Sequence, residues 1–279
     1  MLRWFPGKDI VKCPGCGLVF YEGGAPPGDL YSDEYFSGGE YLDYRGDKKI
    51  IQRNFRRHIK LLHRLAPSGR LLELGCAYGF FLELAREYWE VKGIDVTAAG
   101  VHHARQVIGV NALREDFLTL PDEPESWDVI CLWDTIEHLP HPILTLRKAA
   151  TWLKPGGVLL LTTGDIESRL ARLRGERWRQ IHPPTHLYYF SAATLGKALT
   201  QAGLQVESVS CAGYSRGFRA MMYGLFALPD KKTRWLYQLV TLGGRLDFPV
   251  YLNLFDILLV IARKPATKSV GQQRPRQPH

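Results

Sequence analysis

The sequence has no long apolar run. Its longest strongly apolar stretches, LLLTT and ILLVIA, are far shorter than the roughly 20 residues that cross a bilayer. The N-terminal residues also lack the charged, apolar and small-residue pattern of a signal peptide. We therefore expect no transmembrane segment and a cytoplasmic location.

The chain has only five cysteines. Their number is odd, and all but Cys13 and Cys16 occur singly, which argues against a disulfide framework. Cys13 and Cys16, in CPGCG, have the spacing of half a zinc site. No second pair completes four ligands, and Cys76, Cys131 and Cys211 fit core positions. A metal-free relic, a zinc ion shared between chains and a site completed by histidine are the alternatives. We do not favour zinc here.

Positive charge is unevenly distributed. The formal net charge is +8, and basic residues cluster in KKIIQRNFRRHIKLLHR (48–64) and SRLARLRGERWR (168–179). Ile51, Phe55, Ile59 and Leu62 recur at helical spacing in the first segment. Such segments are typical of solvated helix faces. We expect no specific nucleic-acid partner, because no recognised motif accompanies them, and we keep peripheral contact with an anionic membrane as an alternative.

Strand-like runs alternate with helical patterns from residue 69 onward. The strands are expected at 69–75, 91–96, 111–116, 127–134, 157–165, 204–210 and 255–263, and the helices at 80–89, 97–108, 142–153 and 191–203. Thr97 and Ser191 are predicted N-caps. This alternation predicts an α/β fold with a mostly parallel sheet covered by helices on both faces.

The chain divides into one main domain with appendages. A length of 279 residues with 46% hydrophobic content suits one sizeable core. We expect residues 1–47 to form a CxxCG and Tyr/Gly-rich extension and residues 48–264 to form the main domain. Residues 212–250 should be an aromatic lid inserted in it, and the polar, Pro-containing residues 265–279 a disordered tail.

A glycine-rich turn separates the first main strand from its helix in LLELGCAYGFF, residues 71–81. Doubly wound proteins bind nucleotides at such a turn. A dinucleotide fingerprint needs small residues at its third and sixth positions, which here are Ala77 and Phe80. Phe80 is too large for the close helix packing that a pyrophosphate site requires.

Three acids end successive strands around this turn: Glu73, Asp95 and Asp116. A carboxylate about 4 Å from a phosphate costs about 1 kcal/mol in water and about 4 kcal/mol at an effective dielectric of 20. The same acids would attract a ligand that carries a sulfonium and an ammonium group. Alone, Asp95 or Asp116 could also be a cap or turn residue, and Glu73 could pair with a base.

ELGCAYG resembles the E-x-G-x-x-x-G loop of class I S-adenosylmethionine-dependent methyltransferases. The segments VKGIDV, REDF, WDVICLWDTIEHL and LKPGGVLLLTT follow in the family's order, and DTIEHLPHP and IHPPTHLYYFS are similar to the ubiquinone-pathway O-methyltransferase group. The resemblance covers roughly residues 60–203 and the closing strand FDILLVIARKP. It implies a Rossmann-like, doubly wound, seven-stranded sheet with an antiparallel last strand and helical cap insertions.

The resemblance also implies S-adenosylmethionine as the cofactor. Asp95 matches the acid that holds the ribose hydroxyls, and Asp116 with Phe117 matches the pair beside the adenine. Ala77 replaces a glycine of many members, and its methyl group should fit if the backbone angles permit. The expected cofactor-binding residues are Glu73, Gly75, Cys76, Ala77, Gly79, Asp95, Val96, Asp116, Phe117 and Trp133.

His138 and His186 are the candidate catalytic residues. Methyl transfer to a hydroxyl or phenol needs a proton removed, and histidine titrates near neutral pH. In the resembling group an acid and a histidine, matched by Glu137 and His138, lie near the active site. His138 could instead close the next helix, and the aromatic residues beside His186 could be core.

The sequence thus predicts a methyltransferase that acts on a small-molecule or lipid-like acceptor, with oxygen ahead of carbon or nitrogen as the methylated atom. A nicotinamide-dependent oxidoreductase and a non-catalytic scaffold that binds S-adenosylmethionine are the alternatives. The acceptor and the oligomeric state stay open.

Overall fold

A computed structural model describes residues 2–24, 44–222, 234–243, 245–246 and 248–266. Its main sheet has seven strands in the order β10-β13-β8-β7-β4-β5-β6. Their bounds are β4 (Arg70–Leu74), β5 (Glu90–Asp95), β6 (Ala112–Arg114), β7 (Trp127–Trp133), β8 (Leu153–Gly164), β10 (Gln205–Cys211) and β13 (Ile257–Arg263). All seven predicted strands are confirmed.

The last strand is antiparallel, as predicted. β13 runs antiparallel to both β8 and β10, whereas β8, β7, β4, β5 and β6 pair in parallel. It lies between β8 and β10 inside the sheet, with β10 at the edge. Parallel pairing of the other strands puts their carboxyl ends at one edge of the sheet.

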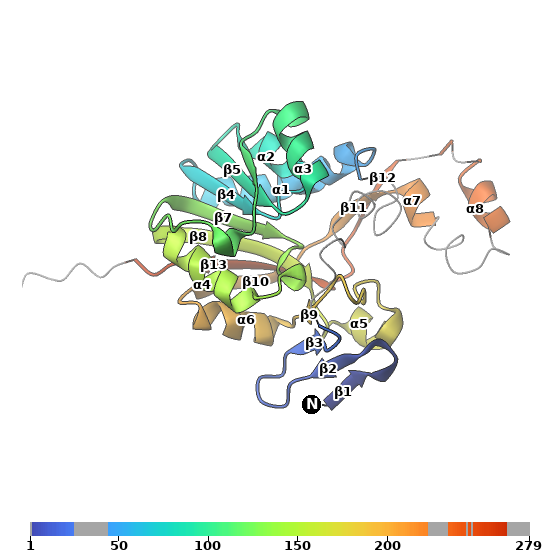
Figure 1. Cartoon of the computed structure of the whole chain (residues 1–279). Helices are drawn as coiled ribbons and strands as arrows, with labels where there is room; N and C mark the ends of the chain where they lie inside the picture. Colours follow the sequence, from blue (N-terminus) through green and yellow to red (C-terminus); the bar gives the residue numbers. More distant parts are fainter. Residues whose placement is uncertain (1, 25–43, 223–233, 244, 247, 267–279) are drawn as a thin grey trace, which may run out of the picture.

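Helices cover both faces of this sheet (Figure 1). α1 (Lys48–Leu65), α2 (Phe80–Ala85) and α3 (Ala98–His103), which continues as the π-helix η3 (Ala104–Ile108), lie on one face. α4 (Pro142–Trp152) and α6 (Ala192–Gln201) lie on the other. Ser191 caps α6 as predicted, since its hydroxyl accepts from the Thr194 backbone N–H.

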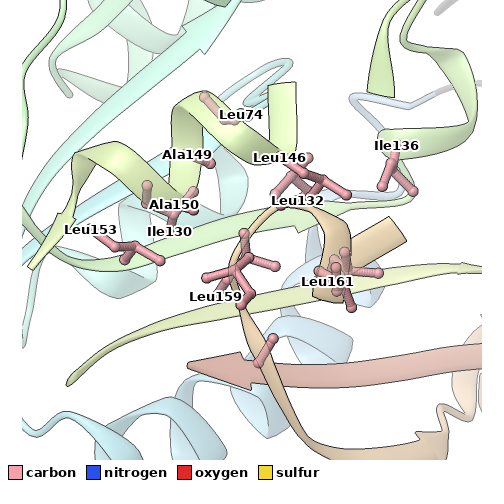
Figure 2. Packing of buried hydrophobic residues seen from close by; sticks show 14 of the residues in the cluster. Leu74, Ile130, Leu132, Ile136, Leu146, Ala149, Ala150, Leu153, Leu159 and Leu161 are labelled. Carbon is pink, nitrogen blue, oxygen red and sulfur yellow. The ribbon is translucent and has the colours of Figure 1, made fainter. Parts of the chain in front are cut away.

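The core between α4 and the sheet is fully dehydrated. Figure 2 shows Leu146 and Ala149 of α4 packed over Ile130 and Leu132 of β7 and Leu159 of β8. These five side chains are all 0% exposed. Each large aliphatic side chain buried in this way stabilises the fold by about 1.5–3 kcal/mol, so the central strands are held firmly beneath the loops that follow them.

The N-terminal segment is joined to the main domain by a second sheet. β1 (Leu2–Phe5), β2 (Ile10–Lys12) and β3 (Val19–Tyr21) form a meander, and β3 pairs antiparallel with β9 (Tyr188–Tyr189). Ile10, Val19 and Tyr189 are buried in one cluster with Trp178. The extension therefore supports the segment that carries His186.

The described part of the predicted lid packs against α1. β11 (Tyr214–Gly217) pairs with β12 (Pro249–Leu252), and the Asn54 side chain exchanges hydrogen bonds with the Ser215 backbone. α5 (Arg169–Arg174), α7 (Phe218–Met222) and α8 (Arg234–Val240) are the remaining α-helices. Residues 223–233, 244 and 247 of the lid, and 267–279 of the predicted tail, lie outside the described residues. None of the described helices is long and apolar enough to cross a membrane.

Leu132→Ala should lower the free energy of unfolding by about 2–5 kcal/mol, because it opens a cavity at a fully buried position of β7. Urea denaturation followed by circular dichroism measures the change. Leu173→Ala, at an 82% exposed position, is the matched control and should change the same free energy by less than about 0.5 kcal/mol. Similar losses in the two variants would contradict the described core.

Candidate functional site

The glycine loop between β4 and α2 has a backbone that few side chains tolerate. Gly75 and Gly79 both have φ +77°. A Cβ at Gly75 would lie 2.5 Å from the Thr135 hydroxyl oxygen, so only glycine allows this loop to approach the loop after β7. Ala77 has φ +42°, a left-handed conformation that is strained for a residue with a side chain. Ala77, which replaces the glycine of the family pattern, therefore has a backbone conformation that glycine would adopt with less strain.

Asp95 fixes this loop from the end of β5. One carboxylate oxygen accepts from the Ala77 backbone N–H at 2.7 Å, and the other accepts from the Thr97 N–H and hydroxyl at 2.8 and 2.6 Å. Thr97 stands at the predicted N-cap of α3, but its side chain accepts no capping hydrogen bond, and its hydroxyl donates to Asp95. Each carboxylate oxygen has two lone pairs, so the oxygen that binds the Ala77 N–H can still accept one hydrogen bond from a ligand.

Glu73 is a buried carboxyl group with an unused oxygen. It is 3% exposed in β4, and its Oε2 has no hydrogen-bond partner. Burial raises the pKa of Glu73 well above its usual value, and the nearby Asp95 raises it further. Cys76 lies beside both acids, since burial, Asp95 and Glu73 all raise the pKa of its thiol. An unpaired buried carboxyl group at this edge fits the ammonium and sulfonium groups of S-adenosylmethionine.

Val96, Asp116 and Phe117, which are also predicted cofactor residues, do not contact the group formed by Glu73, Cys76, Ala77 and Asp95 in any bond described above. Val96 is 50% exposed just after β5. Asp116 is exposed and caps a short 3₁₀ helix by accepting from the Leu118 N–H at 2.9 Å. Phe117 is buried, with its ring edge-on to Trp152 at a centroid distance of 4.8 Å. Glu73, Cys76, Ala77 and Asp95 thus meet, whereas the Asp116 carboxylate is bound to its own turn.

Trp133 ends β7 within an aromatic group that the sequence did not reveal. His58 of α1 stacks on its ring at 4.4 Å, and Phe81 of α2 meets it edge-on at 5.1 Å. The Trp133 indole N–H is buried without a partner. His58 is 7% exposed, and burial lowers its pKa to about 4, so this imidazole is neutral at pH 7. The helical pattern of α1 predicted a core face but not this histidine.

The two candidate catalytic histidines meet beside a buried acid. Glu137 and His138 lie in the 3₁₀ helix η5 (Ile136–His138), and His186 precedes β9. Ring or carboxylate atoms of the three side chains lie within 4.8 Å of one another. The imidazoles of His138 and His186 are perpendicular at a centroid distance of 4.6 Å. Glu137 and His186 are 3% and 4% exposed, so this polar group is largely dehydrated.

Backbone contacts hold these two segments together. The Leu187 N–H donates to the Glu137 carbonyl oxygen at 2.8 Å, and the His138 Nδ1 lies 2.9 Å from the Thr185 carbonyl oxygen. The N-terminal sheet fixes the same segment from its other side through β9. The histidines are therefore positioned by main-chain structure and not only by their own packing.

Asp134 is a site residue that the sequence analysis missed. It follows β7 with φ +47°, and its N–H donates to the carbonyl and hydroxyl oxygens of Thr162. The Tyr214 hydroxyl donates to the Asp134 carboxylate at 3.3 Å. Solvent reaches Asp134, yet surrounding protein raises its pKa. Its position at the end of an apolar strand, like that of Asp95, could have predicted Asp134 as a site residue from the sequence.

The acids in this region influence one another. Burial, reinforced by Asp134, raises the pKa of Glu137 to about 7, and His186 opposes the shift. Tyr214 is contributed by the predicted lid, and no sequence pattern linked it to β7. Asp134, Glu137 and His186 thus form a continuous polar region at the carboxyl end of β7, one strand away from Glu73.

Cys13 and Cys16 lie in the turn between β2 and β3 as free thiols. Hydrogen bonds from Cys16 and Gly15 lower the pKa of Cys13. Within the described ranges, no third cysteine, histidine or acid joins the pair to make a metal site.

Comparisons with known proteins agree with this geometry. A family model described as "Methyltransferase domain" matches residues 47–209. The ubiquinone biosynthesis O-methyltransferase of Xanthomonas axonopodis pv. citri is 34% identical over 161 residues, which are 53% of this chain and 67% of that protein. The protein of the same name from Burkholderia pseudomallei is 27% identical over 166 residues, covering 54% of this chain and 71% of the relative.

Solved structures share the fold. A putative methyltransferase in complex with the Trm112 methyltransferase activator of Haloferax volcanii has a TM-score of 0.58 at 21% identity, over 80% of this chain and 94% of that one. A putative methyltransferase from Bacillus halodurans has a TM-score of 0.55 at 16% identity, over 77% and 100%. At such identities the likeness concerns the fold alone, which is the Rossmann-like sheet expected from the sequence.

Ala77→Gly should raise the free energy of unfolding by about 0.5 kcal/mol. Relief of the left-handed strain, about 1–2 kcal/mol, outweighs the added flexibility of the unfolded chain. Thermal or urea unfolding measures the difference. Ala149→Gly in α4, where the backbone is helical, is the control and should destabilise by about 1 kcal/mol. A destabilised Ala77→Gly variant would argue against this loop conformation.

Asp95→Ala should weaken S-adenosylmethionine binding by at least about 1 kcal/mol. The variant loses a charge-assisted acceptor and the bonds that hold the Ala77 and Thr97 N–H groups. Isothermal titration calorimetry measures the affinity, and Glu90→Ala, at the exposed start of the same strand, is the control. Unchanged affinity in a folded Asp95→Ala protein would refute this role.

Proposed function

Since the chain belongs to the methyltransferase domain family, whose model spans residues 47–209, we propose that it methylates an oxygen atom of a small-molecule or lipid-like acceptor. It is an enzyme that uses S-adenosylmethionine. The observation that carries the acceptor proposal is the convergence of Glu137, His138 and His186 beside the exposed Asp134. The names of the relatives from Xanthomonas and Burkholderia, both ubiquinone biosynthesis O-methyltransferases, support oxygen as the methylated atom.

The cofactor half of the proposed site is built on β4 and β5. S-adenosylmethionine supplies an electrophilic methyl group when it is bound. Glu73 would hold its ammonium group, because the buried Oε2 has no other partner. Asp95 would accept from a ribose hydroxyl while it keeps the loop in place. Gly75 and Gly79 let the loop pack closely against Thr135 and Ala104, which keeps its backbone in place.

The acceptor half of the proposed site lies after β7. A hydroxyl group becomes a good nucleophile only when its proton is removed. The group of Glu137, His138 and His186 supplies a histidine base that would take this proton. Asp134 and Tyr214 are positioned to orient the acceptor through hydrogen bonds.

The alternatives explain the site less well. A nicotinamide cofactor would bring a pyrophosphate to the glycine loop, where Glu73 and Asp95 repel it and the buried Phe80 occupies the start of α2. A non-catalytic scaffold would bind S-adenosylmethionine without turnover on any acceptor. We further propose a cytoplasmic location and no specific nucleic-acid partner. Peripheral membrane contact would suit a lipid-like acceptor.

His186→Ala should lower turnover by at least about 100-fold and leave the affinity for S-adenosylmethionine within about twofold, because the imidazole serves the acceptor and not the cofactor. Mass spectrometry of methylated products across a panel of phenols, catechols and prenylated phenols measures turnover. His141→Ala, at an exposed histidine just after η5, is the matched control. Wild-type turnover by folded His186→Ala would remove His186 from the mechanism.

Native mass spectrometry of the freshly purified chain tests the broader proposal. Retained S-adenosylmethionine or its demethylated product is the expected result, and the same spectrum gives the subunit number. A chain that binds the cofactor but methylates nothing in the panel would favour the scaffold.

A further inference from the structure

We propose that Asn54 is a positioning residue for the acceptor: its side-chain amide holds β11 on α1 and thereby places the Tyr214 hydroxyl beside Asp134. The inference rests on the proposed function for the presence of an acceptor at the end of β7. The hold of Asn54 on β11 itself stands on the contacts between α1 and β11, and it can be tested without any turnover.

The Asn54 amide makes two hydrogen bonds to a single residue of the predicted lid. Its Nδ2 donates to the Ser215 carbonyl oxygen at 3.0 Å, and its Oδ1 accepts from the Ser215 N–H at 2.6 Å. Residues that face each other on antiparallel strands exchange hydrogen bonds in the same way. The Asn54 side chain thus takes the place of a neighbouring strand, and it fixes which residue of β11 lies against α1.

This junction between α1 and β11 is dehydrated. Ser215 is 2% exposed, and its hydroxyl oxygen is buried without a partner among the residues that the structure describes. The Ser215 backbone groups therefore have no solvent that could replace the Asn54 amide. Buried backbone groups without partners are strongly disfavoured, so loss of the amide should release β11 from α1.

The local preference of the chain does not explain an asparagine at this position. Asn54 lies in the interior of the 18-residue helix α1, where asparagine is a poorer helix former than the neighbouring arginine residues. Arg57 of the same helix contacts the partner strand of β11, since its guanidinium lies 3.7 Å from the centre of the Tyr251 ring in β12. α1 therefore contacts both paired strands, and Asn54 supplies the directional hydrogen bonds.

The contact reaches the acceptor half of the proposed site through Tyr214, which directly precedes Ser215. Neighbouring side chains of a strand point to opposite faces, so a strand fixed at Ser215 also fixes the direction of Tyr214. The Tyr214 hydroxyl donates to the Asp134 carboxylate at 3.3 Å. Burial raises the pKa of Tyr214 well above its usual value, and Asp134 raises it further, so the phenol keeps its proton and stays a donor at neutral pH.

Loss of this alignment should affect the acceptor and not the cofactor. Asp134 follows β7 and is exposed, so an acceptor can reach the carboxylate that Tyr214 orients. The cofactor half of the proposed site is built on β4 and β5. Because the reacting atoms must be aligned closely, a small displacement of a positioning group lowers the rate strongly.

Hydrogen–deuterium exchange of the full-length chain tests the hold of Asn54 on β11. In Asn54→Ala the peptide that contains Ser215 should exchange at least about tenfold faster, while the peptides of β7 keep their wild-type rates. Arg53→Ala, at the exposed neighbouring position of α1, is the matched control and should leave exchange in β11 unchanged. Wild-type exchange of β11 in Asn54→Ala would overturn the inference.

Steady-state kinetics test the consequence for the acceptor, with a phenol or catechol that the wild-type chain methylates. Asn54→Ala should raise the KM for this acceptor at least about tenfold and leave the KM for S-adenosylmethionine within about twofold. A purely structural role would instead lower the amount of active enzyme, and hence the apparent kcat, with both KM values unchanged. That result would overturn the positioning role.

A double variant tests whether Asn54 acts through Tyr214. If it does, kcat/KM for the acceptor in the double variant Asn54→Ala, Tyr214→Phe should lie within about twofold of the value for Tyr214→Phe alone. Losses that multiply in the double variant would show that the two residues act independently, which contradicts the proposal.

Exchange and activity together separate this inference from the proposed function. Faster exchange of β11 in Asn54→Ala, in a chain that methylates no acceptor, would refute the proposed function and leave the hold of Asn54 on β11 standing. Turnover by the wild-type chain with exchange that does not respond to Asn54→Ala would overturn the inference and leave the methyltransferase function standing.

Discussion

Parallel pairing of β4 with β5 and β7 is the constraint on which the rest of the structure depends. Because parallel strands end at the same edge, the loops after all three strands meet there. Asp95 then bonds to the Ala77 N–H across that edge, and Gly75 approaches Thr135. The dehydrated core beneath these strands keeps the edge in place (Figure 2).

Two buried carboxyl groups lie at this edge of the sheet. Glu73 and Glu137 are each 3% exposed, and each has an oxygen without a partner. In a fold stabilised by only a few kcal/mol, such groups are costly unless a ligand uses them. They lie at two neighbouring strands, and in the proposed site Glu73 would serve the cofactor and Glu137 the acceptor.

The N-terminal extension and the predicted lid both contact the segments that form the proposed acceptor part. β3 lies beside β9, which starts two residues after His186 (Figure 1). Tyr214 of β11 donates a hydrogen bond to Asp134. Both contacts join segments far apart in the chain. The predicted boundaries stay a prediction, and the contacts around His186 and Asp134 come from the predicted extension, main domain and lid alike.

The sequence by itself determined the seven strands, their helices and the glycine loop, because hydrophobic periodicity and glycine placement are local properties. It also singled out Glu73, Asp95, His138 and His186. Only the tertiary structure decided that His58 stacks on Trp133 and that Glu137 meets His186. Those outcomes depend on which strands pair and which segments cover them, and no local pattern encodes such long-range contacts.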